Sequence, residues 1–458
     1  MRLWFKTIGA HVASKPMFVV LQQTKAKEAT MNNASDGESI AAQRIYRHPL
    51  LEAMNPLIGK QSTDTKRRGG WTQLGITRCS ILMAWSEAST LLDRFTHAYE
   101  LAGAIKADTY TGFSIAIRRL GVRLVGRVRA SLAQRLRNIP AGLWTTRGWC
   151  VFAVDGSKFD APRTVKNEIA MGVSERDKAG PQMLATILVH LGSCVLWNWR
   201  IGKGHASERA HLRRLVGSTP TNSLLVADAG FMGFDCLREV VDSGRHVLVR
   251  LAGNARLIAG LDHRDDVLAL WPETARRRAG PLMLRVISVP DGKGGHVMIG
   301  TSVLDPLRLS DTDAAAFYRM RWDVELAYRS MKQTLDRRKM RSSAPTQAWL
   351  ELHWTMVGLM TLGLLTISRM SRRRSRRRWS VAGALRIVRL CARSLTRARA
   401  DLLLCGLSEA VIGDRTGRAK PARNWPHKKH QKPPGPPNIR VSTPRDHRQL
   451  AQISSIGE

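Results

Sequence analysis

The sequence predicts an α/β protein in which a mixed β-sheet follows an N-terminal helical region and precedes a C-terminal helical region. Apolar residues recur at helical spacing before residue 140 and after residue 313. Between about 149 and 251, short apolar runs typical of buried strands alternate with helical segments. A chain of 458 residues with 43% hydrophobic side chains can also bury a substantial core.

The most unusual property of the sequence is its positive charge. The chain contains 73 Lys and Arg residues against 36 Asp and Glu residues, which gives a formal net charge of +37. Such an excess favours a polyanionic partner, most simply nucleic acid, because basic side chains displace counterions from phosphates. The alternative is a charge that serves only solubility, or a ribosome-like basic tail.

Two further features predict a soluble protein of the cytoplasm. The six cysteines are scattered without short paired spacings, which argues against zinc fingers and favours a reducing compartment. The longest uncharged apolar run, 354–367, has 14 residues, whereas about 20 are needed to span a bilayer. We therefore expect this run to be a buried core helix and expect no membrane partner.

The N-terminal part of the chain divides into a polar segment and a helical region. Residues 1–70 are polar and are predicted to be poorly ordered. Residues 71–145 are predicted to form a helical DNA-binding region, with helices around 81–95 and over 113–136. The second helix carries several Arg side chains opposite its apolar face, and these either contact a DNA backbone or form an ordinary solvated face.

The central region, residues 146–345, follows an α/β pattern. Strands are predicted at 149–154, 183–191, 194–201, 223–228 and 246–251, with helices after Gly204 and Gly233. Residues 253–313 break this rhythm and are predicted to form a β-rich insertion. A long helix is then predicted from about 313 to 340.

The C-terminal part is predicted to begin with helices and to end in a disordered tail. Residues 346–415 form the helical region, which includes an apolar helix at 350–368. Residues 416–458 are basic and rich in Pro and Lys, so they are predicted to be disordered.

Two carboxylates occupy similar positions in the predicted sheet. Asp155 follows the buried strand VFAV, and Asp228 follows the buried strand SLLVA, each close to a glycine. Open α/β sheets place ligand groups at such positions, although a single Asp of this kind is more often a cap or turn residue. Two of them in one sheet, with a third acid available, favour a site that holds Mg²⁺ against phosphate.

The predicted long helix supplies the third acid. Tyr318, Arg321, Glu325 and Lys332 follow one another at intervals of three, four and seven residues, so their side chains share one helix face. Glu325 is the candidate metal ligand, and Arg321 and Lys332 supply positive charge for flanking phosphates. The alternative is an ordinary amphipathic helix with salt bridges on its surface.

These residues carry a family resemblance. The spacing Tyr-x2-Arg-x3-Glu-x6-Lys is the YREK signature, and the segments VDGSKFDAPRT and ADAGF resemble the motifs around the first two DDE carboxylates. Over about 150–340, the chain resembles bacterial transposases of the insertion sequence 4 family. The resemblance implies that residues 146–345 form an RNase H-like catalytic domain, with the β-rich insertion between the second Asp and the Glu.

The resemblance also implies a mechanism and its ligands. In such a transposase Asp155, Asp228 and Glu325 hold two Mg²⁺ ions, for which Mn²⁺ can substitute. The implied activity is metal-dependent cleavage of transposon ends followed by strand transfer into target DNA. The implied partners are double-stranded DNA, as terminal inverted repeats and as target, and a second copy of the chain in a homodimer on DNA.

Five residues are predicted to contact DNA near these carboxylates. Tyr318, Arg321 and Lys332 come from the signature itself. Arg250, at the end of the strand HVLVR, resembles a family arginine near the site. Trp271 is the candidate aromatic against which the family stacks an unpaired base, with a core position as its alternative.

Three other functions stay open on the sequence. A related RNase H-like nuclease would cut DNA without strand transfer. A catalytically inactive, DNA-binding descendant would have no use for carboxylates beside phosphate, so the complete acidic triad argues against it. A general basic RNA-binding protein would leave the spacing of the YREK residues as a coincidence.

Overall fold

The computed structural model describes residues 48–61, 70–102, 109–139, 141–172, 180–290, 295–372, 378–412 and 435–456. The chain divides into Met1–Arg47, which lies outside these residues, and His48–Glu458, to which the following description applies. The predicted disorder of residues 1–47 therefore concerns a segment outside the described part of the chain.

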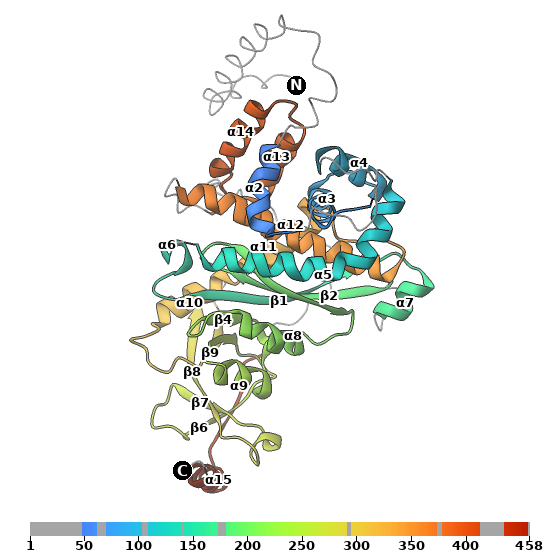
Figure 1. Cartoon of the computed structure of the whole chain (residues 1–458). Helices are drawn as coiled ribbons and strands as arrows, with labels where there is room; N and C mark the ends of the chain where they lie inside the picture. The colour runs from blue at the N-terminus through green and yellow to red at the C-terminus, as the bar shows by residue number, and fades with distance from the viewer. Residues whose placement is uncertain are drawn as a thin grey trace, which may run out of the picture. The chain divides into compact units, whose positions relative to one another are not determined.

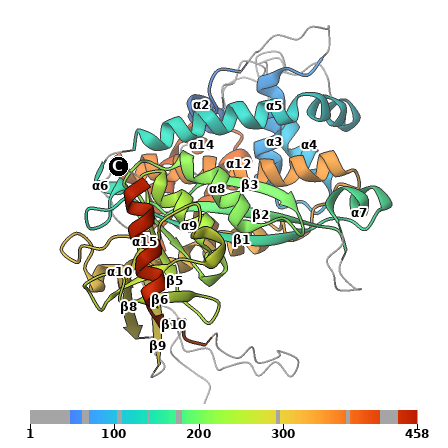
Figure 2. The same cartoon turned by 90° about the horizontal axis from the view of Figure 1, so that it is seen from below.

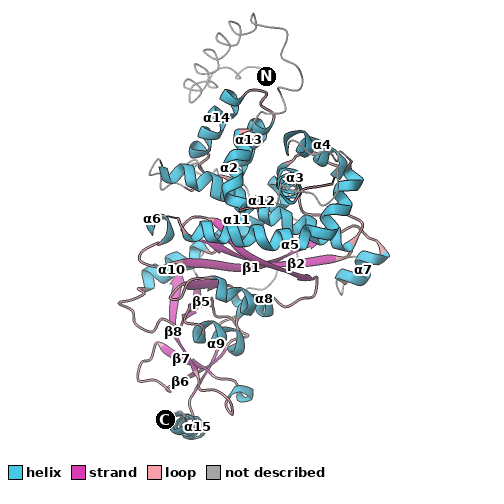
Figure 3. Ribbon diagram, viewed as in Figure 1, coloured by secondary structure: helices cyan, strands magenta, loops and turns pink. Residues whose placement is uncertain are grey.

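The described strands form one mixed sheet (Figure 3). Within the described residues its ten strands follow the order β10-β6-β7-β8-β9-β5-β4-β1-β2-β3. The strands are β1 (Val151–Asp160), β2 (Gln182–His190), β3 (Val195–Lys203), β4 (Leu224–Ala227), β5 (His246–Arg250), β6 (Arg256–Ala259), β7 (Val267–Leu270), β8 (Leu282–Pro290), β9 (His296–Thr301) and β10 (Asn438–Val441). β1, β4 and β5 are parallel, whereas β2 pairs antiparallel with β1 and β3. The order β3-β2-β1-β4-β5 with these directions is that of an RNase H-like core, so the predicted α/β fold class is confirmed.

The helices cover both faces of this sheet. They are α2 (Pro49–Ile58), α3 (Gln73–Trp85), α4 (Leu91–Ala102), α5 (Tyr110–Arg137), α6 (Ala141–Trp144), α7 (Val165–Met171), α8 (Glu208–Leu215), α9 (Phe234–Asp242), α10 (Asp311–Met320), α11 (Trp322–Arg329), α12 (Pro345–Arg372), α13 (Val381–Ala392), α14 (Arg397–Cys405) and α15 (Pro444–Ile456). Short 3-10 helices are η2 (Val216–Ser218), η3 (Ala229–Phe231), η4 (Glu273–Ala275) and η6 (Gly406–Glu409), and η5 (Ser330–Thr334) is a π-helix. Figure 1 shows α5 and α12 on one side of β1 and β2, with α8 and α9 on the other. Because the central strands are covered on both faces, all four residues of β4 are buried.

α12 joins the helical region to the sheet. It packs against α3, α5 and β3, and it is long and apolar enough to cross a membrane by length and composition alone. Most of the apolar part of α12 is buried inside the protein. This agrees with the buried core helix that the sequence predicts at 350–368.

The β-rich insertion extends the central sheet. β6, β7, β8 and β9 pair antiparallel in sequence order, and β9 then pairs with β5 of the core. The predicted insertion is therefore β-rich, and it lies in the same sheet as the strands that precede it.

Two segments predicted to lack structure contain regular elements, and these predictions are wrong there. α2 lies inside the predicted poorly ordered segment 1–70, yet Leu50, Met54 and Ile58 are fully buried. In the predicted tail 416–458, of which 416–434 and 457–458 lie outside the described residues, β10 pairs parallel with β6. Figure 2 shows α15 running past this end of the sheet. Both elements are stabilised by partners far away in sequence, which composition alone does not reveal.

The predicted helix over 313–340 is also interrupted. α10 ends at Met320, α11 begins at Trp322, and the backbone becomes a π-helix over Ser330–Thr334. The helical path ends before Asp336, whose φ of 52° is left-handed. The π-turn begins at Ser330, after Glu325, and contains Lys332, so these two side chains do not keep the simple α-helical alignment that the spacing predicts.

Candidate active site

The register of the sheet sets Asp155 beside Asp228. Ala153 of β1 pairs with Val226 of β4 in parallel, and each Asp lies two residues further along its strand. Since side chains alternate between faces, both carboxylates leave the sheet on the same face. β1 continues to Asp160 and pairs with β2 along this length, so Asp155 lies within its strand. The neighbouring strand β4 ends at Ala227, one residue before Asp228.

The environment of Asp155 disfavours its charged form. Burial raises the pKa of its carboxyl to about 7, and the negative charges of Asp228 and Glu208 contribute to the rise. A hydrogen bond from the Gly156 backbone and the charge of Arg321 oppose it. Asp155 is therefore close to three charged side chains from different parts of the chain.

Asp228 also has a local structural role. Its Oδ1 accepts a hydrogen bond of 2.9 Å from the Gly230 N–H, so it caps the short helix η3. A cap and a metal ligand use different lone pairs of one carboxylate, and the two roles are compatible.

The first three residues of the signature contact one another. Arg321 Nη2 donates to Glu325 Oε1 at 3.1 Å, and the Arg321 guanidinium lies 5.9 Å from the centre of the Tyr318 ring. Burial raises the pKa of the Tyr318 hydroxyl, while the charges of Arg321 and Arg250 oppose the rise. Arg250 is thus close enough to Tyr318 for its charge to act on the hydroxyl.

Lys332 reaches the strand that carries Asp155. Its Nζ donates to Ser157 Oγ at 2.7 Å and lies 5.1 Å from the centre of the Phe159 ring. Burial lowers the pKa of the Lys332 amine, and the charge of Asp160 opposes this shift. The ammonium group is therefore held on β1, two residues beyond Asp155.

Tyr328 is a positioning residue that the sequence patterns do not reveal. Its hydroxyl lies 2.9 Å from the Asp155 carbonyl oxygen and 2.7 Å from the Ala185 carbonyl oxygen, and it is only 5% exposed. One hydroxyl proton shared between these two acceptors ties α11, which carries Glu325, to β1 and β2. Only the position of Tyr328 three residues after Glu325 could have suggested that it faces the sheet.

Glu208 is a second residue that sequence reasoning missed. It lies in the first turn of α8, and a Cβ atom added at Gly156 would approach Glu208 Oε1 to 2.0 Å. The Glu208 carboxylate therefore lies directly over the residue that follows Asp155. A glycine after the first Asp was the available signal, since glycine in a strand often marks a close approach of another group.

The prediction for Trp271 does not fit the structure. Trp271 is 2% exposed, its Nε1 donates to the Ala279 carbonyl at 2.8 Å, and Arg276 lies 5.0 Å over its ring. Because the ring is buried and Arg276 lies over it, a DNA base cannot stack on it. Trp271 is therefore a core residue.

The donor set fits a hard divalent cation. Carboxylate oxygens are the ligands that Mg²⁺ prefers, and the closely placed charges of Asp155, Asp228 and Glu208 repel one another. Glu325 is held by Arg321, and among the described residues no three His, Cys, Asp or Glu side chains already converge as a metal site does.

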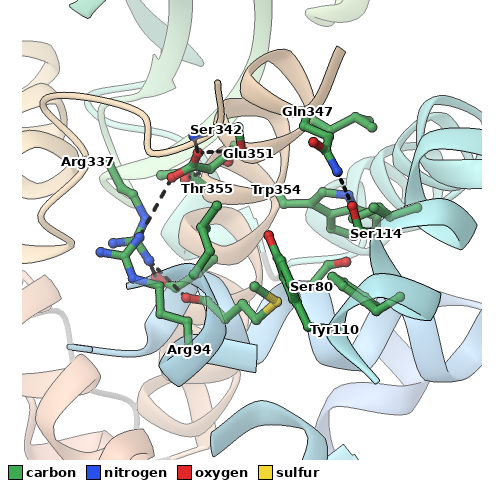
Figure 4. Close-up of a pocket in the computed structure, with 16 residues that line it drawn as sticks. Ser80, Arg94, Tyr110, Ser114, Arg337, Ser342, Gln347, Glu351, Trp354 and Thr355 are labelled. Carbon is green, nitrogen blue, oxygen red and sulfur yellow. Dashed lines mark hydrogen bonds and ion pairs between the residues drawn. The ribbon is translucent and has the colours of Figure 1, made fainter. Parts of the chain in front are cut away.

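A pocket that none of these carboxylates lines lies between α3, α4, α5 and α12 (Figure 4). Arg337 lies on its wall, where Nη2 donates to the carbonyl oxygens of Met83 at 2.9 Å and Ala84 at 3.1 Å. Arg94 lies 3.7 Å from Glu351 across the same region. These contacts link the segment after α11 to the N-terminal helices.

Two of the comparisons with known proteins bear on the sequence of this site. A family model described as "Transposase DDE domain" matches residues 147–360, which include Asp155, Asp228 and Glu325. "Transposase InsG for insertion sequence element IS4" of Escherichia coli (strain K12) is 28% identical over 255 residues. The matched region is 52% of this chain and 56% of that protein, so the chain matches little more than half the length of this relative.

A third comparison concerns structure. The cryo-EM structure of a piggyBac transposase synaptic complex with hairpin DNA matches with a TM-score of 0.43 and 11% identity, over 86% of this chain and 91% of that chain. Similarity at this level carries no argument, and the fold assignment rests on the strand order. Residues 147–360 of this chain are thus similar to a transposase DDE domain, and the chain is similar over 255 residues to a transposase of insertion sequence element IS4.

Proposed function

We propose that this chain is a DNA transposase that cleaves the ends of its own mobile element and transfers them into target DNA. The observation that carries the proposal is the register of β1 and β4, which sets Asp155 beside Asp228 inside the matched domain. Tyr328 ties the helix of Glu325 to the same strand, so the three acids of the signature belong to one region of the fold.

Asp155, Asp228 and Glu325 are the residues that would hold two Mg²⁺ ions, with Mn²⁺ as a substitute. When bound, such ions activate water or a 3′-OH and stabilise the leaving oxygen. Glu325, which now accepts from Arg321, would be a ligand of such an ion, and Arg321 could then donate to a phosphate oxygen.

The surrounding side chains position the DNA backbone. Arg321, Arg250 and Lys332 supply positive charge, and Tyr318 supplies a hydroxyl donor near Arg321. The net charge of +37 favours a polyanionic partner, and double-stranded DNA is such a partner. We further propose that the protein acts in the bacterial cytoplasm as a homodimer on DNA, since two transposon ends are cut in register.

The test of this function separates cleavage from strand transfer. The full chain is incubated with Mg²⁺, a target plasmid and a labelled duplex that carries the element's terminal inverted repeat. We expect cleavage at the element end that exposes a 3′-OH, followed by labelled plasmid. Cleavage without joined product would indicate a nuclease, and binding without cleavage would indicate an inactive DNA-binding descendant.

A further inference from the structure

The pocket between α3, α4, α5 and α12 contains buried polar groups that have no partner. Figure 4 shows Arg94, Glu351 and Trp354 among the side chains that line it. Arg94 Nη2, Glu351 Oε1 and Trp354 Nε1 are buried and make no hydrogen bond within the described part of the chain. Arg94 is only 1% exposed and Trp354 only 3% exposed. Unpaired buried polar groups cost free energy, so three of them around one pocket point to a ligand.

Arg94 and Glu351 face each other without forming a hydrogen bond. Arg94 Nη1 lies 3.7 Å from Glu351 Oε1, which is longer than a hydrogen bond. Other contacts hold each side chain in place. Arg94 Nε donates to the Ala88 carbonyl oxygen at 2.6 Å, and Glu351 Oε2 accepts from the Arg341 N–H at 2.9 Å. The fold therefore keeps the two groups apart and leaves a donor and an acceptor for a third polar group.

The rest of the pocket is mostly apolar and has aromatic walls. The side chains that form these walls include Tyr110, Phe113 and Ile117 of α5 and Leu350 and Trp354 of α12. The space between them is about 70 Å³ and is partly open to solvent. This is room for about five water molecules, or for one small ring of similar bulk. Aromatic walls favour the ring, because a flat apolar surface gains more from burial there than water does.

The charges at the pocket favour a neutral ligand. An anion would be attracted by Arg94 but repelled by Glu351, and a cation would meet the opposite arrangement. The other buried arginine of the pocket, Arg337, already donates to the carbonyl oxygens of Met83 and Ala84. A charged ligand would therefore be buried with one of its neighbours unfavourable, which is costly. A neutral polar molecule can bond to Arg94 and Glu351 together.

We propose that this pocket binds a small, neutral, planar molecule that carries a carbonyl oxygen beside an N–H, as a cyclic amide does. The two lone pairs of its carbonyl oxygen accept from Arg94 Nη2 and Trp354 Nε1, and its N–H donates to Glu351 Oε1. Its ring lies against the aromatic walls. The site shares no residue with the proposed cleavage site, so the proposal does not rest on the proposed function.

The probe for this proposal is 2-pyridone, a single ring with such an edge. It is titrated into the full chain, isotope-labelled at the tryptophan indole nitrogens and observed by NMR. The indole signal that disappears in Trp354→Phe identifies Trp354, and we expect 2-pyridone to shift this signal in a saturable manner. No shift of the Trp354 signal would show that only water serves these groups, and would overturn the proposal.

A second ligand tests the acceptor without any change to the protein. N-methyl-2-pyridone has the same ring and carbonyl oxygen but lacks the N–H, so Glu351 stays without a donor. We expect it to bind wild type about tenfold more weakly than 2-pyridone, or less. Equal affinity for the two ligands would contradict the proposal even where a pocket variant is too unstable to measure.

Two variants test the residues. Glu351→Gln replaces the anionic acceptor at nearly constant shape, and Trp354→Phe removes the indole donor. Each is expected to weaken 2-pyridone binding about tenfold in calorimetric titrations. Trp322→Phe changes a half-exposed tryptophan of α11 and is the matched control, expected to bind as wild type does. Unchanged affinity in both pocket variants would contradict the proposal.

The melting temperature checks where the ligand binds. 2-Pyridone is expected to raise the melting temperature of wild type and of Trp322→Phe, and to raise it less in Glu351→Gln and Trp354→Phe. The melting temperatures without ligand show whether the variants are folded. An equal rise in all four proteins would place binding outside this pocket and overturn the proposal.

Discussion

At the scale of single residues, Asp155 has the clearest chemical consequence. Its pKa is raised from 3.8 to about 7, first by burial and then by the charges of Asp228 and Glu208, with Arg321 opposing. A raised pKa in the folded state means that protonation of Asp155 favours folding. This contribution to stability is fully present below 3.8, the pKa of the carboxyl in the unfolded chain, and is lost as the pH rises through about 7.

The expected result is a pH-dependent metal affinity. Metal binding requires the ionised carboxylate, so Mn²⁺ affinity is expected to rise from about pH 6 to about pH 8 and then level off. The melting temperature of the metal-free protein is expected to fall over the same range, and to fall less in Asp155→Asn. Calorimetric titrations and melting curves across this range check both trends, and equal Mn²⁺ affinity at the two ends would contradict them.

The individual residues differ in how far the sequence could predict them. The sequence could single out Asp155 and Asp228 because each comes directly after an apolar run, which is a local pattern. Glu208 and Tyr328 could not, because their importance lies in contacts with Gly156 and the Asp155 carbonyl that only the folded chain creates. Trp271 was predicted to contact DNA because it lies in the insertion, but its side chain is buried.

At the scale of elements, the contact of α11 with β1 decides whether Glu325 reaches the carboxylates. The Tyr328 hydroxyl bridges Asp155 on β1 and Ala185 on β2 through their carbonyl oxygens. The π-turn that follows α11 then redirects Lys332 onto Ser157. These two contacts hold the C-terminal end of α11 and the π-turn that follows it against β1 and β2.

Tyr328→Phe is expected to loosen this contact. Loss of a buried hydroxyl that serves two carbonyl oxygens is expected to lower the free energy of unfolding by about 1–3 kcal/mol. Cleavage in single-turnover conditions at saturating DNA is expected to slow, because the change loosens the helix that carries Glu325. Tyr110→Phe, whose hydroxyl makes no hydrogen bond among the described residues, is the control. Equal cleavage rates in the two variants would contradict this role.

The elements were predictable where apolar runs were continuous and local. The predicted strands at 183–191 and 194–201 correspond closely to β2 and β3. The break at Arg321 and the π-turn were not predictable, because helical periodicity continues through both. β10 could not be predicted from the sequence, because this short strand forms only by pairing with the edge of β6, which is far away in sequence.

At the scale of the whole molecule, Arg337 connects the catalytic domain to the N-terminal helices. It is 1% exposed, and Nη2 donates to the carbonyl oxygens of Met83 and Ala84 at the end of α3. Burial lowers the pKa of its guanidinium to about 9, and the nearby charge of Arg94 adds to the shift. The segment that leaves the signature helix is therefore anchored in a different region of the fold.

Arg337→Met is expected to weaken this connection. Buried carbonyl oxygens are left without a donor, so the free energy of unfolding is expected to fall by about 2–4 kcal/mol. Arg338→Met changes the exposed neighbouring residue and is expected to have little effect on stability. Denaturant unfolding of the two variants checks this, and equal stability would show that Arg337 does not join the two regions. The sequence could not predict this link, because an arginine in a basic protein is expected on the surface.

The most direct test of the central claim compares cleavage of the labelled element end by wild type, Asp155→Asn, Asp228→Asn and Glu325→Gln in Mg²⁺ and in Mn²⁺. Asp265→Asn, an exposed acid in the insertion, serves as control. Each of the three site variants is expected to lose cleavage while DNA binding persists, and the control is expected to cleave as wild type does. Wild-type cleavage by any of the three site variants would contradict the assignment of that carboxylate to the active site.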